Sequence, residues 1–491
     1  MSERAPVQER SNLLVIICDQ MRADVLGCYG SPICRTPHLD ALAAAGTRFA
    51  RAYTTTPLCT PARGSLMTGR YPHSHRLVAN TQYAETPTPT LPPDERMVSE
   101  HLAAAGYRCD YAGKWHLNRG DEAAEAMRRG FTTFGGTREA YAQALATAGI
   151  ARERSSLLGS ERIMRGEDAP MCGTSPTDAD RTYNSFIADE AIALLRGYGA
   201  DGIGDAGRPF ALWCSMPGPH FPLEVPAQYD RMYDPASVPR PASFADTFAG
   251  KPGGQCWHPW LQLAAHLSWP GWQRLIAHYW GYVTYMDALV GRVLAALDEA
   301  GLRERTAVVF LADHGEMAGH HRMFDKGPYL YEDVMRVPLI FRYPGKVPDG
   351  VVIGDGFANL VDLAPTLCGL AGIQPEGGRP FEGQSLLPAL RGDVSLSGDV
   401  FAETNTGDLV NPQLDTRMIR RGDWKYVFRP GDRDELYHLG DDPNEMTNRI
   451  ADARVVRADL RDALSAWMER TQDPLRAYLD SYRRYPQLEV F

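Results

Sequence analysis

The sequence lacks any apolar run long enough to cross a membrane. Its first apolar segment, Leu13 to Cys18, closes on Asp19, whereas a membrane-spanning helix needs about 20 apolar residues. The polar opening MSERAPVQER, followed by this short run, also lacks the layout of a signal peptide. We therefore expect a cytoplasmic protein with no membrane partner.

Paired cysteines are missing as well. The nine cysteines are an odd number, lie scattered along the chain and never form a Cys-x-x-Cys pair. This pattern does not suit a disulfide-stapled scaffold, which needs an even set at regular spacings. It indicates free thiols in a reducing compartment.

Positive charge is in short supply, because 51 Lys and Arg residues face 61 Asp and Glu residues and leave a formal net charge of −10. This balance argues against broad binding of nucleic acids or anionic membranes. A protein of this kind that handles an anion must gather its cations locally. At 491 residues the chain is long enough for two or more domains.

Apolar runs alternate with helical patterns over most of the chain. This alternation predicts an α/β fold with a large, mostly parallel sheet between helices, in which ligands bind beyond the carboxyl ends of the strands. Asp19 and Asp313 each close an apolar run, so both should emerge at that edge. The expected strands are 12–19, 210–216, 307–313 and 337–341, and the expected helices are 37–45, 97–105, 185–196 and 279–300.

The pattern changes toward the C-terminus. A Gly- and Pro-rich stretch, 372–383, interrupts it, and the chain becomes more polar after about residue 390. Residues 418–428 predict a hairpin that turns at Gly422–Asp423, and 455–471 predict an amphipathic helix. We expect a catalytic domain over 1–390 and a smaller α+β domain with an antiparallel sheet over 391–491. The aromatic tail could dock on a second copy, so a homo-oligomer is an expectation.

The stretch CTPARGSLMTG, 59–69, predicts a short helix, because Pro61 fits a first turn and Gly69 can end it. Cys59 would then lie at a helix N-terminus, where unpaired N–H groups favour negative charge. Arg63 adds a fixed cation one turn later. Taken alone, the same pattern also suits a structural cysteine buried beside a helix cap.

Two pairs of polar residues follow expected strands at the same sheet edge. These pairs are Asp19–Gln20 and Asp313–His314. Carboxylate and amide oxygens suit Ca²⁺ or Mg²⁺, and one imidazole also admits Mn²⁺. The pattern favours a divalent metal about as much as it favours ordinary loop residues.

Four further residues carry candidate chemistry. Lys114 and His116 are two residues apart and would share one face of an extended segment. His220 stands between prolines in PGPHFP, which predicts a stiff loop after a strand. Lys326 lies in a loop before another strand. Each of them, taken alone, also fits a surface lysine or a loop histidine without a chemical task.

Together the motifs resemble the sulfatase family of the alkaline-phosphatase superfamily. CTPAR, 59–63, resembles the first sulfatase signature, Cys/Ser-x-Pro-x-Arg, and GYRCDYAGKWHL, 106–117, resembles the second. CDQ, PGPHFP, ADHGE, DKGPYLYED, VDLAPTL and ELYHLGDDPNE follow in the family's order. The resemblance covers nearly the whole chain and implies an alkaline-phosphatase-like sheet sandwich.

The resemblance implies a sulfatase that hydrolyses aryl, carbohydrate or small-alcohol sulfates to an alcohol and inorganic sulfate. In this family the signature cysteine becomes formylglycine, made by a formylglycine-generating enzyme, and the hydrated aldehyde is the nucleophile. Cys59 takes that place. The implied metal ligands are Asp19, Gln20, Asp313, His314 and residue 59, with Ca²⁺ first and Mn²⁺ or Mg²⁺ as alternatives. Many relatives have Asp where Gln20 stands and Asn where His314 stands, a departure that favours Mn²⁺ more than the common pattern does.

The remaining roles also follow from the resemblance. Arg63 would hold the diol, Lys114 and Lys326 would neutralise sulfate oxygens, and Asn80 would bind sulfate. His220 would bind the bridging oxygen of the substrate and, with Lys326, assist protonation of the leaving alcohol. His116 would take the proton that releases sulfate.

Two alternatives stay open. One is a phosphonate monoester hydrolase or phosphodiesterase of the same superfamily, which the Lys114–His116 pair disfavours. The other is a protein that binds sulfated ligands while Cys59 stays a thiol. The leaving-group specificity should lie in the loops 135–180 and 235–275, which no motif explains.

Overall fold

The structure is a computed structural model of the chain. It describes residues 10–82, 86–150, 172–204, 208–256, 261, 264–265, 267–405 and 415–485. Among the helices of these residues, none combines the length and the apolar character that a bilayer crossing requires.

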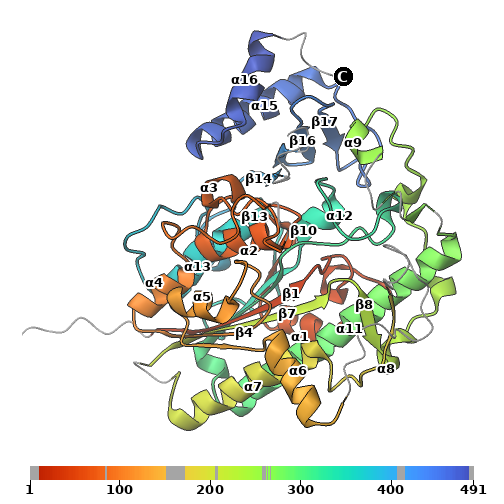
Figure 1. Cartoon of the computed structure of the whole chain (residues 1–491). Helices are drawn as coiled ribbons and strands as arrows, with labels where there is room; N and C mark the ends of the chain where they lie inside the picture. Colours follow the sequence, from red (N-terminus) through yellow and green to blue (C-terminus); the bar gives the residue numbers. More distant parts are fainter. Residues whose placement is uncertain are drawn as a thin grey trace, which may run out of the picture.

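An eight-stranded, mostly parallel sheet forms the centre of the molecule (Figure 1). Its middle strand β1 is parallel to its neighbours β7 and β9, and β4 and β5 continue the parallel order beyond β7. β11 runs antiparallel to β9 and β2, so the sheet is mixed on that side. The spatial order is β12 (Val351–Ile353), β2 (Thr47–Phe49), β11 (Leu339–Arg342), β9 (Thr306–Ala312), β1 (Asn12–Asp19), β7 (Phe210–Pro219), β4 (Arg108–Gly113) and β5 (Thr133–Gly135).

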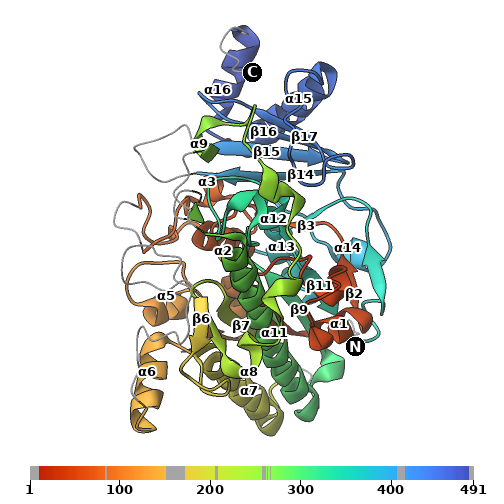
Figure 2. The ribbon, with the colours of Figure 1, turned by 90° about the vertical axis from the view of Figure 1, so that its right-hand side faces the viewer.

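Helices cover both faces of this sheet (Figures 1 and 2). One face carries α1 (Pro37–Ala44), α7 (Tyr183–Asp201) and α11 (Trp269–Glu299), and the other carries α2 (Cys59–Thr68), α4 (Val98–Ala104) and α13 (Leu363–Leu370). Every residue of β1 is buried. A strand covered on both faces needs continuous rather than alternating apolar residues, which explains the run NLLVIIC.

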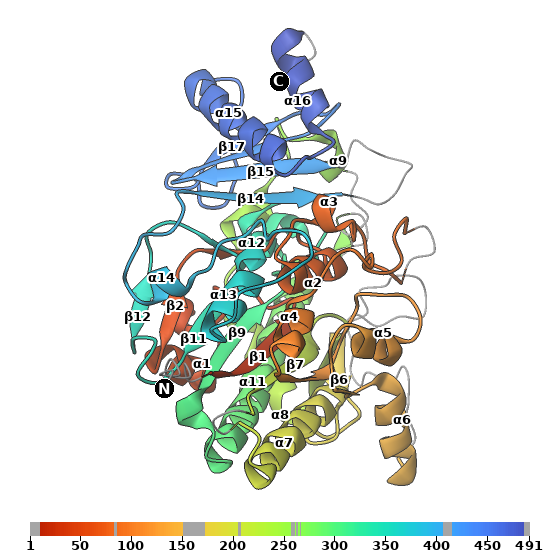
Figure 3. The ribbon, with the colours of Figure 1, turned by 90° about the vertical axis from the view of Figure 1, so that its left-hand side faces the viewer.

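A four-stranded antiparallel sheet lies toward the C-terminus, above the helices α2 and α3 in Figure 3. Its strands β15 and β16 form the expected hairpin, with Gly422 in the left-handed region at φ 55°. α15 packs on β15 and β16. The elements are β14 (Asp399–Thr404), β15 (Thr416–Arg421), β16 (Trp424–Phe428), β17 (Glu435–His438), α15 (Arg454–Arg470) and α16 (Arg476–Arg484).

Smaller strands and α-helices lie between these elements. Three short strands, β10, β3 and β13, form a second sheet, and β6 pairs with β8. The bounds are β3 (Ala52–Tyr53), β6 (Cys172–Ser175), β8 (Leu223–Pro226), β10 (Arg336–Val337), β13 (Ala358–Asn359), α3 (Pro72–His75), α5 (Glu122–Arg128), α6 (Arg138–Thr147), α8 (Ala227–Asp230), α9 (Gly253–Cys256), α12 (Glu332–Met335) and α14 (Leu387–Leu390).

The predicted fold class is confirmed, with two local corrections. The run 337–341 is not one parallel strand: it divides at Pro338 into β10 and the antiparallel β11, because proline cannot donate to a strand ladder. The helix expected at 279–300 begins at Trp269, where Pro270 occupies the first turn. The domain boundary at 390 stays a prediction.

Candidate active site

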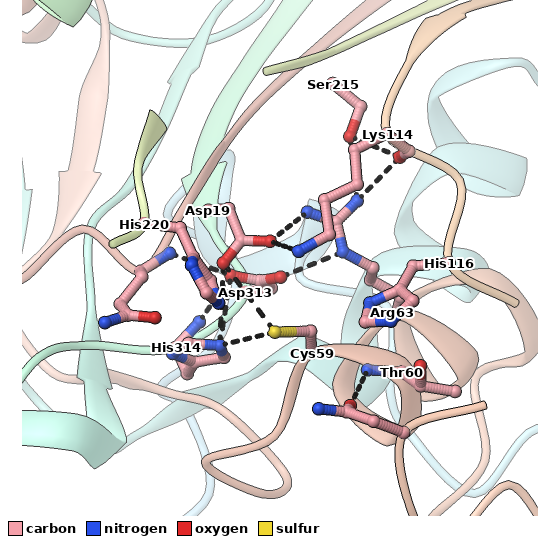
Figure 4. Close-up of polar contacts among 12 residues, drawn as sticks. Asp19, Cys59, Thr60, Arg63, Lys114, His116, Ser215, His220, Asp313 and His314 are labelled. Carbon is pink, nitrogen blue, oxygen red and sulfur yellow. Dashed lines mark hydrogen bonds and ion pairs between the residues drawn. The ribbon is translucent and has the colours of Figure 1, made fainter. Parts of the chain in front are cut away.

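Four neighbouring parallel strands deliver polar residues to one edge of the large sheet. Lys114 follows β4, His220 follows β7, and Asp313 follows β9, while Asp19 is the last residue of β1. The carboxyl ends of adjacent parallel strands meet at the same edge, where α/β proteins bind their ligands. Figure 4 shows these four side chains converging there.

Helix α2 brings Cys59 to this edge. The helix begins at Cys59 and ends at Thr68, and it is capped by Gly69, whose φ of 65° suits a residue without a Cβ. The Cys59 thiol is fully buried, 3.2 Å from His314 Nε2 and 3.8 Å from Asp19 Oδ1. The predicted position of Cys59 at a helix N-terminus is therefore confirmed.

Arg63, one turn further along α2, holds the two strand-end carboxylates. Its Nη2 lies 3.1 Å from Asp19 Oδ2 and its Nε lies 2.9 Å from Asp313 Oδ2. Nη1 donates to Ser215 Oγ at 2.8 Å and to the Lys114 carbonyl at 2.9 Å. Burial lowers the pKa of the guanidinium, but the carboxylates of Asp313 and Asp19 outweigh it and raise the pKa. Arg63 therefore stays charged and fixes the geometry of both acids.

The side chains of Asp19, Cys59, Asp313 and His314 could hold a metal ion, and we call them the active-site cluster. One ligand atom from each residue lies within 4.8 Å of the others, and all four residues are buried. Two carboxylates and one imidazole, with a thiol in the place of the implied aldehyde, form a donor set that fits Ca²⁺, Mg²⁺ or Mn²⁺. The backbone N–H of Gln20 donates to Asp313 Oδ1 at 3.1 Å and ties Gln20 to this cluster.

Two lysines add positive charge beside the cluster. Lys114 Nζ donates to Asp19 Oδ2. Lys326 Nζ lies 2.6 Å from Gln20 Oε1, 2.6 Å from His220 Nε2 and 3.1 Å from Asp325 Oδ1. Burial lowers the pKa of Lys326, yet Asp325 outweighs this effect and raises the pKa. The His220 pKa is held well below its usual value by burial and by Lys326. Lys326 is therefore charged while His220 is neutral.

The local charges also set the acid–base state of the cluster. Burial raises the pKa of Asp19, but the positive charges of Lys114 and Arg63 outweigh it and hold the pKa well below its usual value. The His314 pKa is raised to about 9, because Asp313 and Cys59 outweigh the lowering effect of burial. Burial raises the Cys59 pKa, as does Asp19, yet the surrounding cations lower it overall. An anion placed here would be stabilised.

His116 lies differently from its predicted position. It has a left-handed backbone with φ 60°, so the segment after β4 is not extended, and Lys114 and His116 do not share a strand face. Its Nε2 lies 2.6 Å from Gln82 Oε1. Within the described residues, its buried Nδ1 has no hydrogen-bond partner. Burial, Lys114 and Arg63 all lower the pKa of His116, which identifies it as a neutral imidazole beside the active-site charges.

Asn80 reaches the site through α2. Its Oδ1 accepts a hydrogen bond of 3.0 Å from the backbone N–H of Thr60, the residue after Cys59. This bond satisfies one of the unpaired N–H groups of the helix N-terminus. The contact anchors Asn80 next to Cys59, and its sulfate-binding role stays a prediction.

Three residues of the site escaped the sequence-based prediction. Ser215, inside β7, joins Arg63 to the Lys114 carbonyl. Gln82 contacts His116, and Glu316 accepts a hydrogen bond from the Gln20 amide. Glu316 stands within the motif ADHGE, so a signal for it existed; Ser215 and Gln82 carry none.

Comparison with known proteins identifies relatives that match most of the chain. The sulfatase family model matches residues 11–373, and the model of the N-sulphoglucosamine sulphohydrolase C-terminal region matches 319–473. The uncharacterized sulfatase YidJ of Escherichia coli (strain K12) is 30% identical over 485 residues, with 97% of this chain and 90% of YidJ covered. The steryl-sulfatase of Mus musculus is 32% identical over 431 residues, covering 81% of this chain and 67% of its own.

A solved structure also resembles this chain. The phosphonate monoester hydrolase of Agrobacterium radiobacter superposes with a TM-score of 0.77 at 27% identity, covering 94% of this chain and 96% of the hydrolase. The phosphonate monoester hydrolase of Agrobacterium radiobacter therefore shares the architecture of this chain.

Proposed function

The chain belongs to the sulfatase family, and from this premise we propose that it is a sulfuric ester hydrolase whose nucleophile is a formylglycine made from Cys59. The observation that carries the proposal is the position of Cys59: a buried thiol at the N-terminus of α2, 3.2 Å from His314 and bordered by Arg63 and two lysines. A plain buried structural cysteine has no need of three neighbouring cations.

The substrate is an anionic sulfate monoester. Lys114 and Lys326 would neutralise its sulfate oxygens, since preorganised charges in a buried site stabilise the charge of a transition state. Arg63 would hold the modified side chain of residue 59 from one turn along the same helix, as well as the two acids it already contacts. Asn80 would donate its amide N–H₂ to sulfate from beside Thr60.

In the aldehyde form, residue 59 supplies, as a hydrate, one hydroxyl that attacks sulfur and a second whose deprotonation releases sulfate. The modification requires a formylglycine-generating enzyme as a maturation partner. The neutral His116, whose Nδ1 is free of other bonds within the described residues, would accept the proton from the second hydroxyl.

His220 and Lys326 would handle the proton of the leaving group. His220 Nδ1 lies 2.5 Å from the carbonyl of Phe221, so this nitrogen carries the hydrogen and Nε2 is left as an acceptor. Lys326 Nζ donates to that Nε2. A charged lysine beside a neutral imidazole provides one proton that the departing alkoxide or phenoxide can take.

A divalent ion, Ca²⁺ first and Mn²⁺ or Mg²⁺ as alternatives, would be held by Asp19, Gln20, residue 59, Asp313 and His314. When bound, it supplies Lewis acidity that polarises the sulfate and lowers the pKa of a nearby hydroxyl. Arg63 orients the carboxylates of Asp19 and Asp313. The residues around Gln20 orient its side-chain amide.

A phosphonate monoester hydrolase is the second candidate, favoured by the structural likeness to the Agrobacterium radiobacter enzyme. The Lys114–His116 pair favours the sulfatase. Turnover of nitrophenyl sulfate and of a phenyl phosphonate ester by the same preparation tests the ranking. We expect a higher kcat/KM on the sulfate, and a preference for the phosphonate would reverse the assignment.

The matched control is Cys59→Ala, which should lower sulfate hydrolysis by on the order of 10⁴-fold or more, since the nucleophile is lost. The mass of the peptide 57–70 should show the aldehyde in active protein. Active protein that carries only the thiol would contradict the mechanism. Ligand binding without turnover by the thiol form would favour the binding-protein alternative.

A further inference from the structure

The side-chain amide of Gln20 lies between two charged groups of opposite sign. Its Nε2 donates to Glu316 Oε2, and its Oε1 accepts from Lys326 Nζ at 2.6 Å. Gln20 is fully buried and Glu316 is 5% exposed. The two residues are 296 positions apart in the chain, so the fold, not local sequence, brings them together.

These two contacts fix the direction in which the amide points. A carboxylate can only accept hydrogen bonds, and an ammonium group can only donate them. The amide therefore has a single satisfied orientation: Nε2 toward Glu316 and Oε1 toward Lys326. The oxygen is the atom that could ligate a divalent ion, because the N–H₂ group has no lone pair to offer.

Glu316 is itself held in place. Its other oxygen, Oε1, accepts backbone N–H groups from Ala318 at 3.0 Å and from Asp325 at 2.5 Å. Backbone donors cannot rotate to suit a new partner, so Oε1 is committed to the loop and Oε2 is left for Gln20. The carboxylate is thus aimed from a rigid frame.

We propose that Glu316 is a positioning residue that turns the Gln20 oxygen into the active site and requires an amide, not a carboxylate, at position 20. This inference rests on the metal site of the proposed function. The inference explains why position 20 has an amide where many relatives have Asp. A carboxylate at position 20 would face the carboxylate of Glu316 in a buried setting, where like charges repel strongly.

The substitution Glu316→Gln tests the orientation directly. The new amide must keep its oxygen toward the two backbone N–H groups, so its N–H₂ would face the N–H₂ of Gln20. Two donors in contact lose their hydrogen bond, and Gln20 can recover it only by turning its oxygen away from Lys326. We expect divalent-metal affinity to fall at least about tenfold, the usual scale for losing a partner that orients a ligand.

Position 20 allows a sharper test by exchange. In Gln20→Glu, two carboxylates face each other. In the double variant Gln20→Glu with Glu316→Gln, the N–H₂ of residue 316 can donate to the new carboxylate, while Lys326 still donates to its other oxygen. Glu316→Gln should therefore weaken metal binding when it is made in the wild type and strengthen it about tenfold when it is added to Gln20→Glu.

The measurement is the affinity of the purified full-length protein for Mn²⁺ and for Ca²⁺, obtained by competition with a chelating indicator dye. The matched control lies in the Gln255–Glu435 pair, in which Gln255 Nε2 donates to Glu435 Oε1 at 2.9 Å and Gln255 Oε1 accepts from Tyr331 at 2.6 Å. Gln255→Glu repeats the charge clash at another buried amide and should leave metal affinity within twofold of the wild type.

A simple loss of negative charge near the ion would weaken binding in both backgrounds, and that result would overturn the proposal, as would no effect in either background. If Glu316→Gln alone does not fold, the proposal is tested by comparing Gln20→Glu with the double variant, which should bind the metal more tightly. Suppose that Glu316→Gln weakens metal binding in the wild type and strengthens it in Gln20→Glu, but the wild-type protein hydrolyses no sulfate ester. That result would refute the proposed function and would leave the positioning role of Glu316 supported. Sulfate hydrolysis by the wild type, without opposite effects of Glu316→Gln in the two backgrounds, would refute only the positioning role of Glu316.

Discussion

Among the described residues, two buried groups of candidate metal ligands each place a histidine and two carboxylates beside an arginine, but only one of the two has the properties of a reaction site. The first is the active-site cluster with Arg63. The second, which we call the brace cluster, consists of His73, Glu403, Arg417 and Asp473. It joins α3 to β14, β15 and the turn after α15. In each cluster, candidate ligand atoms lie within 4.8 Å of one another.

The clusters differ in where their hydrogen bonds go. In the brace cluster, His73 Nδ1 contacts Glu403 Oε2 at 2.5 Å and Nε2 contacts the Thr471 carbonyl at 3.3 Å. Both ring nitrogens face acceptors, so His73 is a cation. Arg417 donates to both oxygens of Asp473. Two cations therefore neutralise two anions within the cluster.

The active-site cluster has more positive groups around it than the brace cluster has. Lys114 and Lys326 add positive charge to Arg63, and the side chain of Lys114, which donates to Asp19, is 19% exposed. The side chains of both clusters themselves are at most 4% exposed. An added anion would therefore find extra positive charge at the first cluster but not at the second. Proximity of ligand atoms alone does not make a metal site, because the balance of charge around those atoms also decides.

The largest expected difference between the two clusters is in metal binding, because only the active-site cluster should bind an ion. Chelator treatment should remove one ion per chain and lower sulfate hydrolysis by on the order of 10³-fold, because Lewis-acid stabilisation is worth several kcal/mol. Adding Ca²⁺, Mn²⁺ or Mg²⁺ back separately, with the bound metal measured by elemental analysis, should restore activity with at least one of them.

The matched variants are Asp313→Asn and Asp473→Asn, one from each cluster. We expect the first to lose the ion and the second to keep it. Two ions per chain, or retention of one ion by Asp313→Asn with loss in Asp473→Asn, would contradict the assignment of the clusters. Failure of all three metals to restore activity would remove the metal from the proposed function.

Arg417→Met should destabilise the fold without changing the chemistry. Arg417 is fully buried between Glu403 and Asp473, and removing one partner of a buried ion pair costs about 3–5 kcal/mol because a charge is left unpaired. Denaturant unfolding would measure this loss, while kcat per active site, counted by aldehyde content, should stay close to that of the wild type.

Arg421→Met supplies the control on the same strand. Arg421 pairs with Asp399 and Asp459, but its side chain is 40% exposed, so its loss should cost less than about 1 kcal/mol. Equal losses in the free energy of unfolding for the two variants would show that burial does not make the Arg417 ion pairs more important for stability than the exposed pairs of Arg421. Arg63→Met, in contrast, should lower both stability and kcat.

Sequence patterns predicted the active-site cluster far better than the brace cluster. Asp19 and Asp313 were predictable because apolar runs end at each of them, and the strand-end rule then places both at one edge. Cys59 required the resemblance of its surrounding motif. The contacts of Gln20 with Glu316, and of His73 with Glu403, join residues 296 and 330 positions apart; they depend on how separate elements pack, which no local periodicity encodes. The brace residues stand outside every motif that we recognised.

The smallest expected effect is a pH dependence of stability that arises from the brace cluster. Burial lowers the pKa of His73, but Glu403 outweighs it and raises the pKa above the usual value of about 6.5. The folded protein therefore holds a proton that the unfolded chain releases above about pH 6.5, so this contribution is complete below that pH and is lost as pH rises through the folded pKa. Burial raises the Glu403 pKa, yet His73 and Arg417 lower it to about 2, so its contribution is lost only as pH falls from about 4.5 toward 2.

Between these limits, about pH 4.5 to 6.5, both contributions should be at their maximum. Urea unfolding of the wild type and of His73→Gln at intervals from pH 5 to 9 would measure the difference. The gap in the free energy of unfolding between the two proteins should narrow as pH rises, by at most about 1.4 kcal/mol per pH unit for a single proton. A gap that stays constant over this range would show that His73 is neutral in the folded protein, and the brace cluster would then carry an uncompensated negative charge.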